Sequence, residues 1–230
     1  MTPEIVTRSF SNDQAVFDSV FFNNRYQIKG NKEKGQGKVF ADIGAHAGFF
    51  SFLALTLGAR KVYAFEPYID NFNILLKNCY TPNFVGRFTP YQLGINIEGS
   101  LGRFGAPQLV DNIYFDLSSV GFSINNESTY PCRCETLDNL LTENCFDENI
   151  DVLKINIGYA EREILLGSSK LPEKVNSICG EIAANDLQLF EFKKALGIKG
   201  FINFKSGQPD NNERVLFWAS KGNLSDNFIE

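Results

Sequence analysis

The chain has 230 residues, of which 43% are hydrophobic, and this length suits one α/β domain with a large core. Its net charge of −5 provides no electrostatic footprint for nucleic acid or for an anionic membrane surface. No stretch is apolar enough to span a bilayer and the start lacks the pattern of a secretory signal, so we expect a cytoplasmic protein without nucleic-acid or membrane partners.

Residues 1–37 have the pattern of an N-terminal cap that leads into the main domain. Apolar residues recur at helical spacing within Asp13–Phe22, which predicts a short helix. The following segment, Asn23–Gly37, is polar and rich in glycine, as is typical of a loop. We therefore expect the main domain to occupy residues 38–230.

From Lys38 onward, short apolar strands alternate with helical patterns, which predicts parallel strands joined by crossover helices. The predicted strands are Lys38–Asp42, Lys61–Phe65, Phe88–Leu93, Asp151–Ile157 and Val175–Ile182. The predicted helices are Ala47–Leu57, Tyr68–Cys79, Thr136–Leu141, Ala160–Leu166 and Leu187–Leu196, with Thr136 as an N-cap and Gly58 and Gly197 as stops.

The last two strands are predicted at Gly200–Phe204 and Arg214–Ser220. The turn-rich connection between them is too short for a parallel crossover, so the two strands must form an antiparallel hairpin. The sequence therefore predicts a Rossmann-like α/β fold with helices on both faces, whose mostly parallel sheet has an antiparallel last strand.

The segment 94–130 interrupts this alternation. It is rich in Gly, Asn and Ser, and its apolar pieces are short: Leu101–Phe104, Asn112–Phe115 and Val120–Ile124. We interpret it as strands and loops inserted at the sheet edge. It either decorates that edge or forms a wall over a substrate pocket, and we favour the pocket wall because long connections in such folds tend to carry binding groups.

The cysteines point to reduced thiols. The five cysteines are scattered along the chain, and an odd, scattered set does not suit a disulfide framework. The pair Cys132 and Cys134 lacks further ligands, since a zinc site needs about four and the one histidine, His46, is distant in sequence. We expect no metal site.

A ligand cradle is indicated by the ends of the first two strands. The first strand runs into Asp42 and Gly44, a helix follows, and the second strand ends in Glu66. Gly44 permits a tight turn, and N–H groups at the start of the following helix point toward a bound molecule. Glu66 can accept hydrogen bonds from both hydroxyls of a ribose. Either half alone suits an ordinary strand–turn–helix, whereas the pair in this order favours a cofactor site.

The order of residues in the first turn distinguishes two cofactor classes. Dinucleotide folds carry G-x-G-x-x-G, because a pyrophosphate lies against bare backbone. Here the order is D-x-G-A-x-x-G, and the carboxylate of Asp42 would repel a pyrophosphate but suit an amino group. This favours S-adenosylmethionine and disfavours a nicotinamide oxidoreductase.

Four segments and the last strand resemble the FkbM-type family of S-adenosylmethionine-dependent methyltransferases. The segments are Phe40–Ser51, Val62–Pro67, Glu135–Leu140 and Ile150–Ile155, and the strand contains Val215–Ala219. The resemblance implies a seven-stranded sheet and O-methylation of a small-molecule or sugar hydroxyl.

The resemblance also implies roles for individual residues. Asp42, Gly44, Ala45 and His46, within a loop that extends to Gly48, would surround the methionine part of the cofactor; Glu66 would hold the ribose; and Pro67, Tyr68, Gln92, Leu93 and Gly94 would flank the adenine.

One segment departs from the family pattern K-I-D-[VI]-E-G-A-E. Asn156 replaces the aspartate, Gly158 the first glutamate and Tyr159 the small glycine, while Ala160 and Glu161 are kept. An amide cannot act as a general base. The alternatives are catalysis mainly by positioning, with Asn156 orienting the acceptor, or a catalytically impaired protein that binds the cofactor as a structural or regulatory module.

Three further residues are candidates for the site or the core. His46 titrates near neutrality and is a second catalytic candidate, although its side chain can equally face solvent or a helix terminus. Glu181 lies either in the pocket floor or at a solvated edge, and Trp218 is expected to pack in the core.

Overall fold

The computed structural model describes residues 5–28, 35–99, 102–105, 129–142, 145–146, 148–158, 160–210 and 213–228. The strands of its main sheet are β1 (Val39–Ile43), β2 (Lys61–Phe65), β3 (Phe88–Tyr91), β8 (Ile150–Ile155), β9 (Val175–Ala183), β10 (Asn203–Ser206) and β11 (Arg214–Ser220). The α-helices are α1 (Asp13–Phe21), α3 (Phe49–Thr56), α4 (Ile69–Cys79), α5 (Leu137–Thr142), α6 (Glu161–Gly167), α7 (Leu171–Lys174) and α8 (Asp186–Ile198).

The main sheet confirms the predicted fold class. Its seven described strands lie in the order β10-β11-β9-β8-β1-β2-β3. Strands β3, β2, β1, β8 and β9 are parallel, and β11 is antiparallel to both of its neighbours. The last strand is thus antiparallel as expected, and it lies inside the sheet with β10 at the edge.

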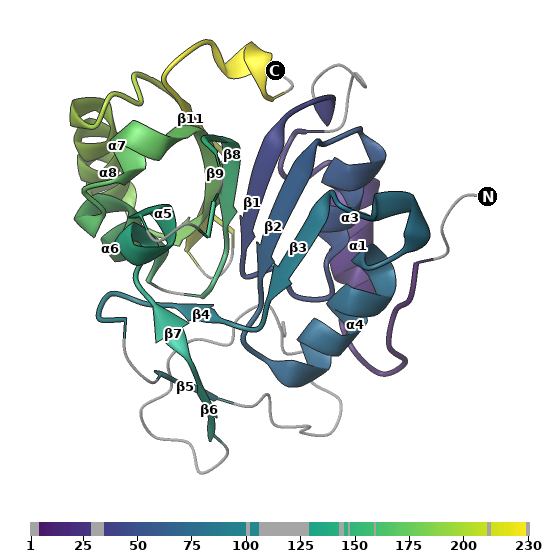
Figure 1. Cartoon of the computed structure of the whole chain (residues 1–230). Coiled ribbons are helices and arrows are strands. Elements are labelled where there is room, and N and C mark those ends of the chain that lie inside the picture. The colour runs from purple at the N-terminus through teal and green to yellow at the C-terminus, as the bar shows by residue number, and fades with distance from the viewer. Residues whose placement is uncertain are drawn as a thin grey trace.

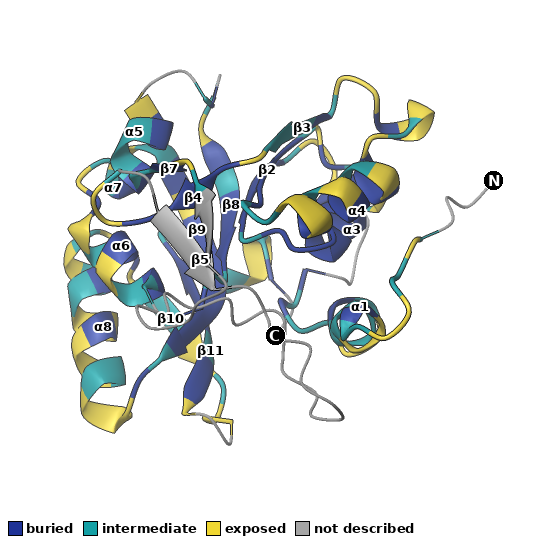
Figure 2. Ribbon diagram, turned by 90° about the horizontal axis from the view of Figure 1, so that it is seen from below, coloured by how far each residue is buried: buried dark blue, intermediate teal, exposed yellow. Residues whose placement is uncertain are grey.

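Helices cover both faces of the sheet (Figure 1). On one face lie α1, α3 and α4, and on the other lie α5 to α8. The strands alternate between two cores: in β1, Val39, Ala41 and Ile43 pack toward the second group of helices, while Phe40 packs toward the first. Because both faces are covered, β1 is buried along its whole length and its neighbours β2, β8 and β9 are mostly buried, which Figure 2 shows for the labelled strands.

The described residues before β1 are built into the core on the α3 side. Phe17 of α1 packs against Phe49 of α3, with ring centroids 5.6 Å apart. Beyond α1, Tyr26 and Ile28 are buried in the same core. The short helix predicted at Asp13–Phe22 is confirmed.

The helix ends test the predicted caps. Gly58 follows α3 with a φ of +92°, and the Thr136 hydroxyl accepts a hydrogen bond from the Asn139 N–H at 3.1 Å, so both predictions are confirmed. The predicted stop at Gly197 is wrong, because α8 continues to Ile198 and Gly200 takes the left-handed conformation with φ +92°.

The segment that interrupts the alternation of strands and helices, together with the residues that follow it, forms two small sheets apart from the main one. Strand β4 (Gly94–Ile95) pairs in parallel with β7 (Cys134–Glu135), and β5 (Gly102–Gly105) pairs antiparallel with β6 (Thr129–Cys132). β4 follows the edge strand β3 after two residues, so it starts at that strand's carboxyl end. The pieces predicted at Asn112–Phe115 and Val120–Ile124 lie outside the described residues, as does Leu101.

Among the described residues, no helix combines the length and the apolar character that crossing a membrane requires.

Candidate functional site

A cavity of about 570 Å³ lies at the carboxyl ends of β8, β1, β2 and β3. Nine of the predicted site residues line it: Gly44, Ala45, His46, Glu66, Pro67, Tyr68, Leu93, Gly94 and Asn156. Three do not: Asp42, Gly48 and Gln92. The predicted residues therefore come together from four strand ends that are far apart in the sequence.

The turn after β1 is held tightly against the end of β8. Gly44 has a φ of +76°, and a Cβ atom there would lie 1.9 Å from the carbonyl oxygen of Asn156. The N–H groups of Gly44 and Ala45 both donate to the Phe65 carbonyl at 2.9 Å, and that of Gly48 donates to the Ala45 carbonyl at 2.8 Å. Only glycine fits at position 44, and these three N–H groups are used within the protein.

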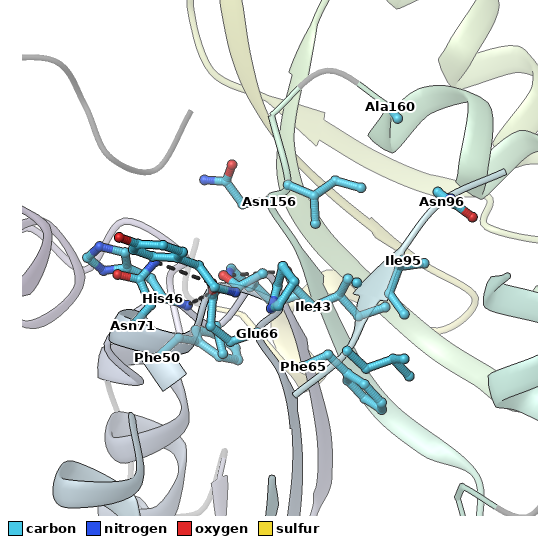
Figure 3. Close-up of a pocket in the computed structure, with 18 of the residues that line it drawn as sticks. Ile43, His46, Phe50, Phe65, Glu66, Asn71, Ile95, Asn96, Asn156 and Ala160 are labelled. Atoms are coloured by element: carbon cyan, nitrogen blue, oxygen red, sulfur yellow. Dashed lines mark hydrogen bonds between the residues drawn. The ribbon is translucent and has the colours of Figure 1, made fainter. Parts of the chain in front are cut away.

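Glu66 joins the turn to α4. Its Oε2 accepts from the His46 N–H at 2.8 Å, and its Oε1 accepts from the Tyr68 N–H at 3.0 Å and from the Asn71 amide at 3.3 Å. Figure 3 shows Glu66, His46 and Asn71 gathered at one side of the cavity. Burial raises the pKa of Glu66 and outweighs the lowering by these hydrogen bonds. Oε2 accepts one bond and keeps capacity for a further donor, whereas Oε1 already accepts two.

Asp42 is fully buried and paired with Lys154, which the sequence interpretation did not single out. The Lys154 Nζ lies 2.9 Å from Asp42 Oδ1, and the Ser51 hydroxyl donates to Oδ2 at 2.7 Å. Burial disfavours the charged lysine, but the attraction of Asp42 keeps the pKa of Lys154 above its ordinary value. The Lys154 side chain lines the cavity, so Asp42 is separated from that space by its partner. The available signal in the sequence was a lysine near the end of a mostly apolar strand, which the structure pairs with the strand of Asp42.

His46 connects the turn to the start of α1. Its Nε2 lies 3.6 Å from Asp13 Oδ1 and 3.4 Å from Arg8 Nη2. Arg8 in turn forms an ion pair with Asp13 at 2.7 Å. Burial alone would raise the pKa of Asp13, but the hydrogen bonds from Arg8 and the charge of His46 hold it below its ordinary value. The ring thus lies beside a buried carboxylate and lines the cavity.

Asn156 follows β8 and belongs to a buried polar cluster. Its Nδ2 donates to Glu181 Oε2 at 3.1 Å and to the Tyr26 hydroxyl oxygen at 3.2 Å. Glu181 is 5% exposed and is paired with Arg25 at 2.5 Å and with Arg214 at 3.6 Å. Glu181 therefore occupies neither a solvated edge nor the cavity lining, but lies behind Asn156.

Two further observations concern this cluster. Tyr26, which lines the cavity, was missed because its segment has a loop-like composition and no local signal of function. Glu161 Oε1 accepts from the N–H groups of Ile157 and Gly158 at 2.9 and 2.8 Å, which closes the turn after β8. Tyr159 lies outside the described residues.

The Trp218 indole, predicted to pack in the core, is 4% exposed and donates to the Tyr26 carbonyl at 3.1 Å.

Comparison with known proteins places these features in a family. The FkbM methyltransferase domain model matches residues 42–197. The crystal structure of methyltransferase FkbM from Methylobacillus flagellatus is 18% identical, with a TM-score of 0.54, and the match covers 88% of this chain and 47% of that one. The human methyltransferase 10 domain containing protein is 15% identical, with a TM-score of 0.51 and coverage of 90% and 81%.

No curated protein sequence matches the chain. At these identities the two structures show the shared fold, whereas the family model covers more than half of the sequence. The chain belongs to the FkbM methyltransferase domain family.

Proposed function

We propose that this protein is an S-adenosylmethionine-dependent O-methyltransferase acting on a small-molecule or sugar hydroxyl. The observation that carries the proposal is Glu66, a buried carboxylate at the end of β2 that lines a cavity of about 570 Å³. That volume is in the range of small-molecule sites, roughly 300–1,000 Å³. In this proposal the Glu66 carboxylate accepts hydrogen bonds from the ribose hydroxyls, and Pro67 and Leu93 provide apolar surface for the adenine.

The charge of the cavity supports a cationic ligand. Glu66 and Glu98 line it, while the ammonium group of Lys154 is offset by Asp42. Carboxylates near a positively charged sulfur stabilise it by Coulomb attraction. When bound, the cofactor supplies a methyl group on such a sulfur.

Residues 38–230 form the methyltransferase domain, and residues 1–37 cap it. Support for the cap comes from Val16, Val20 and Tyr26, which precede β1 and line the cavity. They close the site on the α1 side and exclude water from it. The acceptor lies beyond the end of β8, near Asn156.

Catalysis proceeds mainly by alignment of the acceptor oxygen. Asn156 cannot act as a general base, and the His46 imidazole, which also lines the cavity, is the second candidate for that role. Correct orientation of the reacting atoms alone accounts for a large part of the rate in such reactions.

A cofactor-binding protein without transferase activity is the second candidate. It is favoured by one observation: Asn156 Nδ2 donates to Glu181 and Tyr26 and so has no hydrogen left for an acceptor. Measurement of S-adenosylhomocysteine formation with hydroxylated acceptors separates the two. We expect product with at least one acceptor class, and binding without turnover across neutral sugars and phenols would favour the second candidate.

Substitution of Glu66 by alanine should weaken S-adenosylmethionine binding about 10- to 100-fold, because hydrogen bonds to a charged group contribute roughly 1.5–3 kcal/mol. Isothermal titration calorimetry measures this effect, and Glu173→Ala on the exposed surface is the control. Absence of binding by the folded wild-type protein at millimolar cofactor would reject the proposed function. Equal affinities of wild type and Glu66→Ala would show that the ribose is held elsewhere.

The pH dependence of binding provides a separate check. Because burial raises the pKa of Glu66 above 4.5, its carboxylate gains a proton at a higher pH than an ordinary glutamate and then accepts fewer hydrogen bonds. Cofactor affinity should therefore fall as the pH is lowered toward that raised pKa. Glu66→Gln should bind weakly and with little change between pH 5 and 8; a pH profile identical to that of the wild type would contradict the assignment.

A further inference from the structure

The sheet order indicates where each part of the cofactor lies, given the proposed function. The strands that end at the cavity are ordered β8-β1-β2-β3. With adenine beside Leu93 after β3 and the ribose at Glu66 after β2, the amino-acid part extends over the ends of β1 and β8. That part carries a carboxylate, which requires hydrogen-bond donors when it leaves water.

Four backbone N–H groups of the turn after β1 are engaged within the protein. The N–H groups of Gly44 and Ala45 bind the Phe65 carbonyl, and the N–H of His46 binds Glu66. Gly48 donates to a carbonyl within the turn itself. These four N–H groups are therefore engaged, and side chains are a further source of donors for a carboxylate at this end of the cavity.

Most side-chain donors at this end are also engaged. The three hydrogens of the Lys154 ammonium face Asp42 Oδ1 at 2.9 Å, the Gly44 carbonyl at 2.6 Å and the Ile43 carbonyl at 3.4 Å. The amide of Asn156 uses both hydrogens within the polar cluster.

The hydroxyl group of Tyr26 differs from these donors, because its hydrogen is not used by the residues that the structure describes. Glu181 is a carboxylate and only accepts, so it orients the Asn156 amide with Nδ2 toward itself and toward Tyr26. The Tyr26 oxygen is thereby an acceptor, and its own hydrogen has no acceptor among the residues that the structure describes. Burial raises the pKa of Tyr26, so the hydroxyl keeps that hydrogen at neutral pH.

The position of Tyr26 is fixed by packing. Its ring meets Phe50 edge-on, with centroids 5.3 Å apart and planes at 85°, and Lys154 Nζ lies 5.7 Å from the ring centre. The side chain is 5% exposed and lines the cavity on the β8 side. A neutral hydroxyl donor is thus held rigidly in the cavity wall, where it can donate a charge-assisted hydrogen bond to an anionic oxygen.

We propose that Tyr26 donates a hydrogen bond to the carboxylate of the methionine part of S-adenosylmethionine, and that Asn156 and Glu181 are positioning residues that set the direction of this bond. Asn156 thereby acts on the cofactor through Tyr26. The tyrosine binds and orients the cofactor and exchanges no proton with it.

Two nucleosides that differ in the amino-acid part test this inference by calorimetry. S-adenosylhomocysteine carries the carboxylate, and 5′-deoxy-5′-methylthioadenosine lacks the whole amino-acid group. In Tyr26→Phe, which keeps the ring and its contact with Phe50, affinity for S-adenosylhomocysteine should fall about 10- to 100-fold. Affinity for 5′-deoxy-5′-methylthioadenosine should change less than about 2-fold, since the lost hydrogen bond is not available to it.

Tyr91→Phe is the matched control, because the Tyr91 hydroxyl donates to the Cys145 carbonyl at 3.3 Å and Tyr91 does not line the cavity. It should leave both affinities unchanged. An equal loss for both nucleosides in Tyr26→Phe would mean a general structural role, and no loss for either would place the carboxylate on another residue such as His46. Both results overturn the inference while leaving the proposed function intact, whereas failure of the wild type to bind either nucleoside rejects the proposed function itself.

Discussion

Replacement of Lys154 by methionine should lower the free energy of unfolding by about 3–5 kcal/mol, since it leaves a buried carboxylate without its cation. Asp42 is fully buried, and its other described partner is the neutral hydroxyl of Ser51. Methionine matches the length of the lysine stem, so the loss comes from the charge and not from a cavity. The Gly44 carbonyl also loses its partner, which loosens the turn at the proposed cofactor site.

Urea unfolding followed by circular dichroism measures this loss. Lys77→Met on the exposed face of α4 is the control and should change stability by less than about 0.5 kcal/mol. The double variant Asp42→Asn with Lys154→Met should recover part of the loss, because it removes the unpaired charge. A single variant as stable as the control would mean that the pair contributes nothing to the fold.

The fold could be predicted from the sequence because its signals are local. Apolar runs such as Val39–Ile43 and Lys61–Phe65 are bounded by turn residues, and the short connection before Arg214 allows only an antiparallel pairing. Helix ends were less certain. Gly197 is tolerated inside the last turn of α8, where nothing in the local sequence distinguishes it from the terminating Gly200.

The candidate site could be predicted only in part. Residues that directly follow strand ends, such as Gly44, Glu66 and Asn156, line the cavity as their position in the sheet requires. Asp42 lies inside β1, one residue before its end, and pairs with Lys154 instead of lining the cavity, because a buried carboxylate requires a partner. Tyr26 could not be found, since the role proposed for it depends on a contact with Asn156, which is 130 positions away in the sequence.

The sequence that follows β8 departs from the family pattern, and the conformation of Gly158 gives a structural explanation for this departure. This residue has a φ of +117°, a conformation that glycine adopts and a glutamate does not tolerate without strain. Its carbonyl accepts from Arg214, and its N–H donates to Glu161. The turn is therefore built around glycine, and the Asn156 amide joins the same cluster through Glu181 and Arg214. Of the altered residues, Asn156 and Gly158 thus belong to one hydrogen-bonded turn.

Substitution of Gly44 by alanine should destabilise the protein by about 4 kcal/mol or more and abolish cofactor binding. The added Cβ would lie 1.9 Å from the Asn156 carbonyl oxygen and 2.9 Å from its carbon, and both are backbone atoms. Neither can move without separating β1 from β8, whose pairing continues to Ile43 and Ile155. The clash therefore displaces the turn that carries Ala45 and His46 away from Glu66.

The substitution Gly86→Ala introduces the same backbone strain without a steric clash, so it separates the two causes of destabilisation. Gly86 has a φ of +77°, against +76° at Gly44, and a Cβ there would meet nothing within 4 Å. It should cost only about 1–2 kcal/mol, the strain of a left-handed alanine, and leave S-adenosylmethionine binding unchanged. Urea unfolding and calorimetry on both variants measure the two effects. Equal destabilisation by both substitutions would mean that the turn after β1 yields to the added methyl group, and that its close contact with the end of β8 is not what shapes the site.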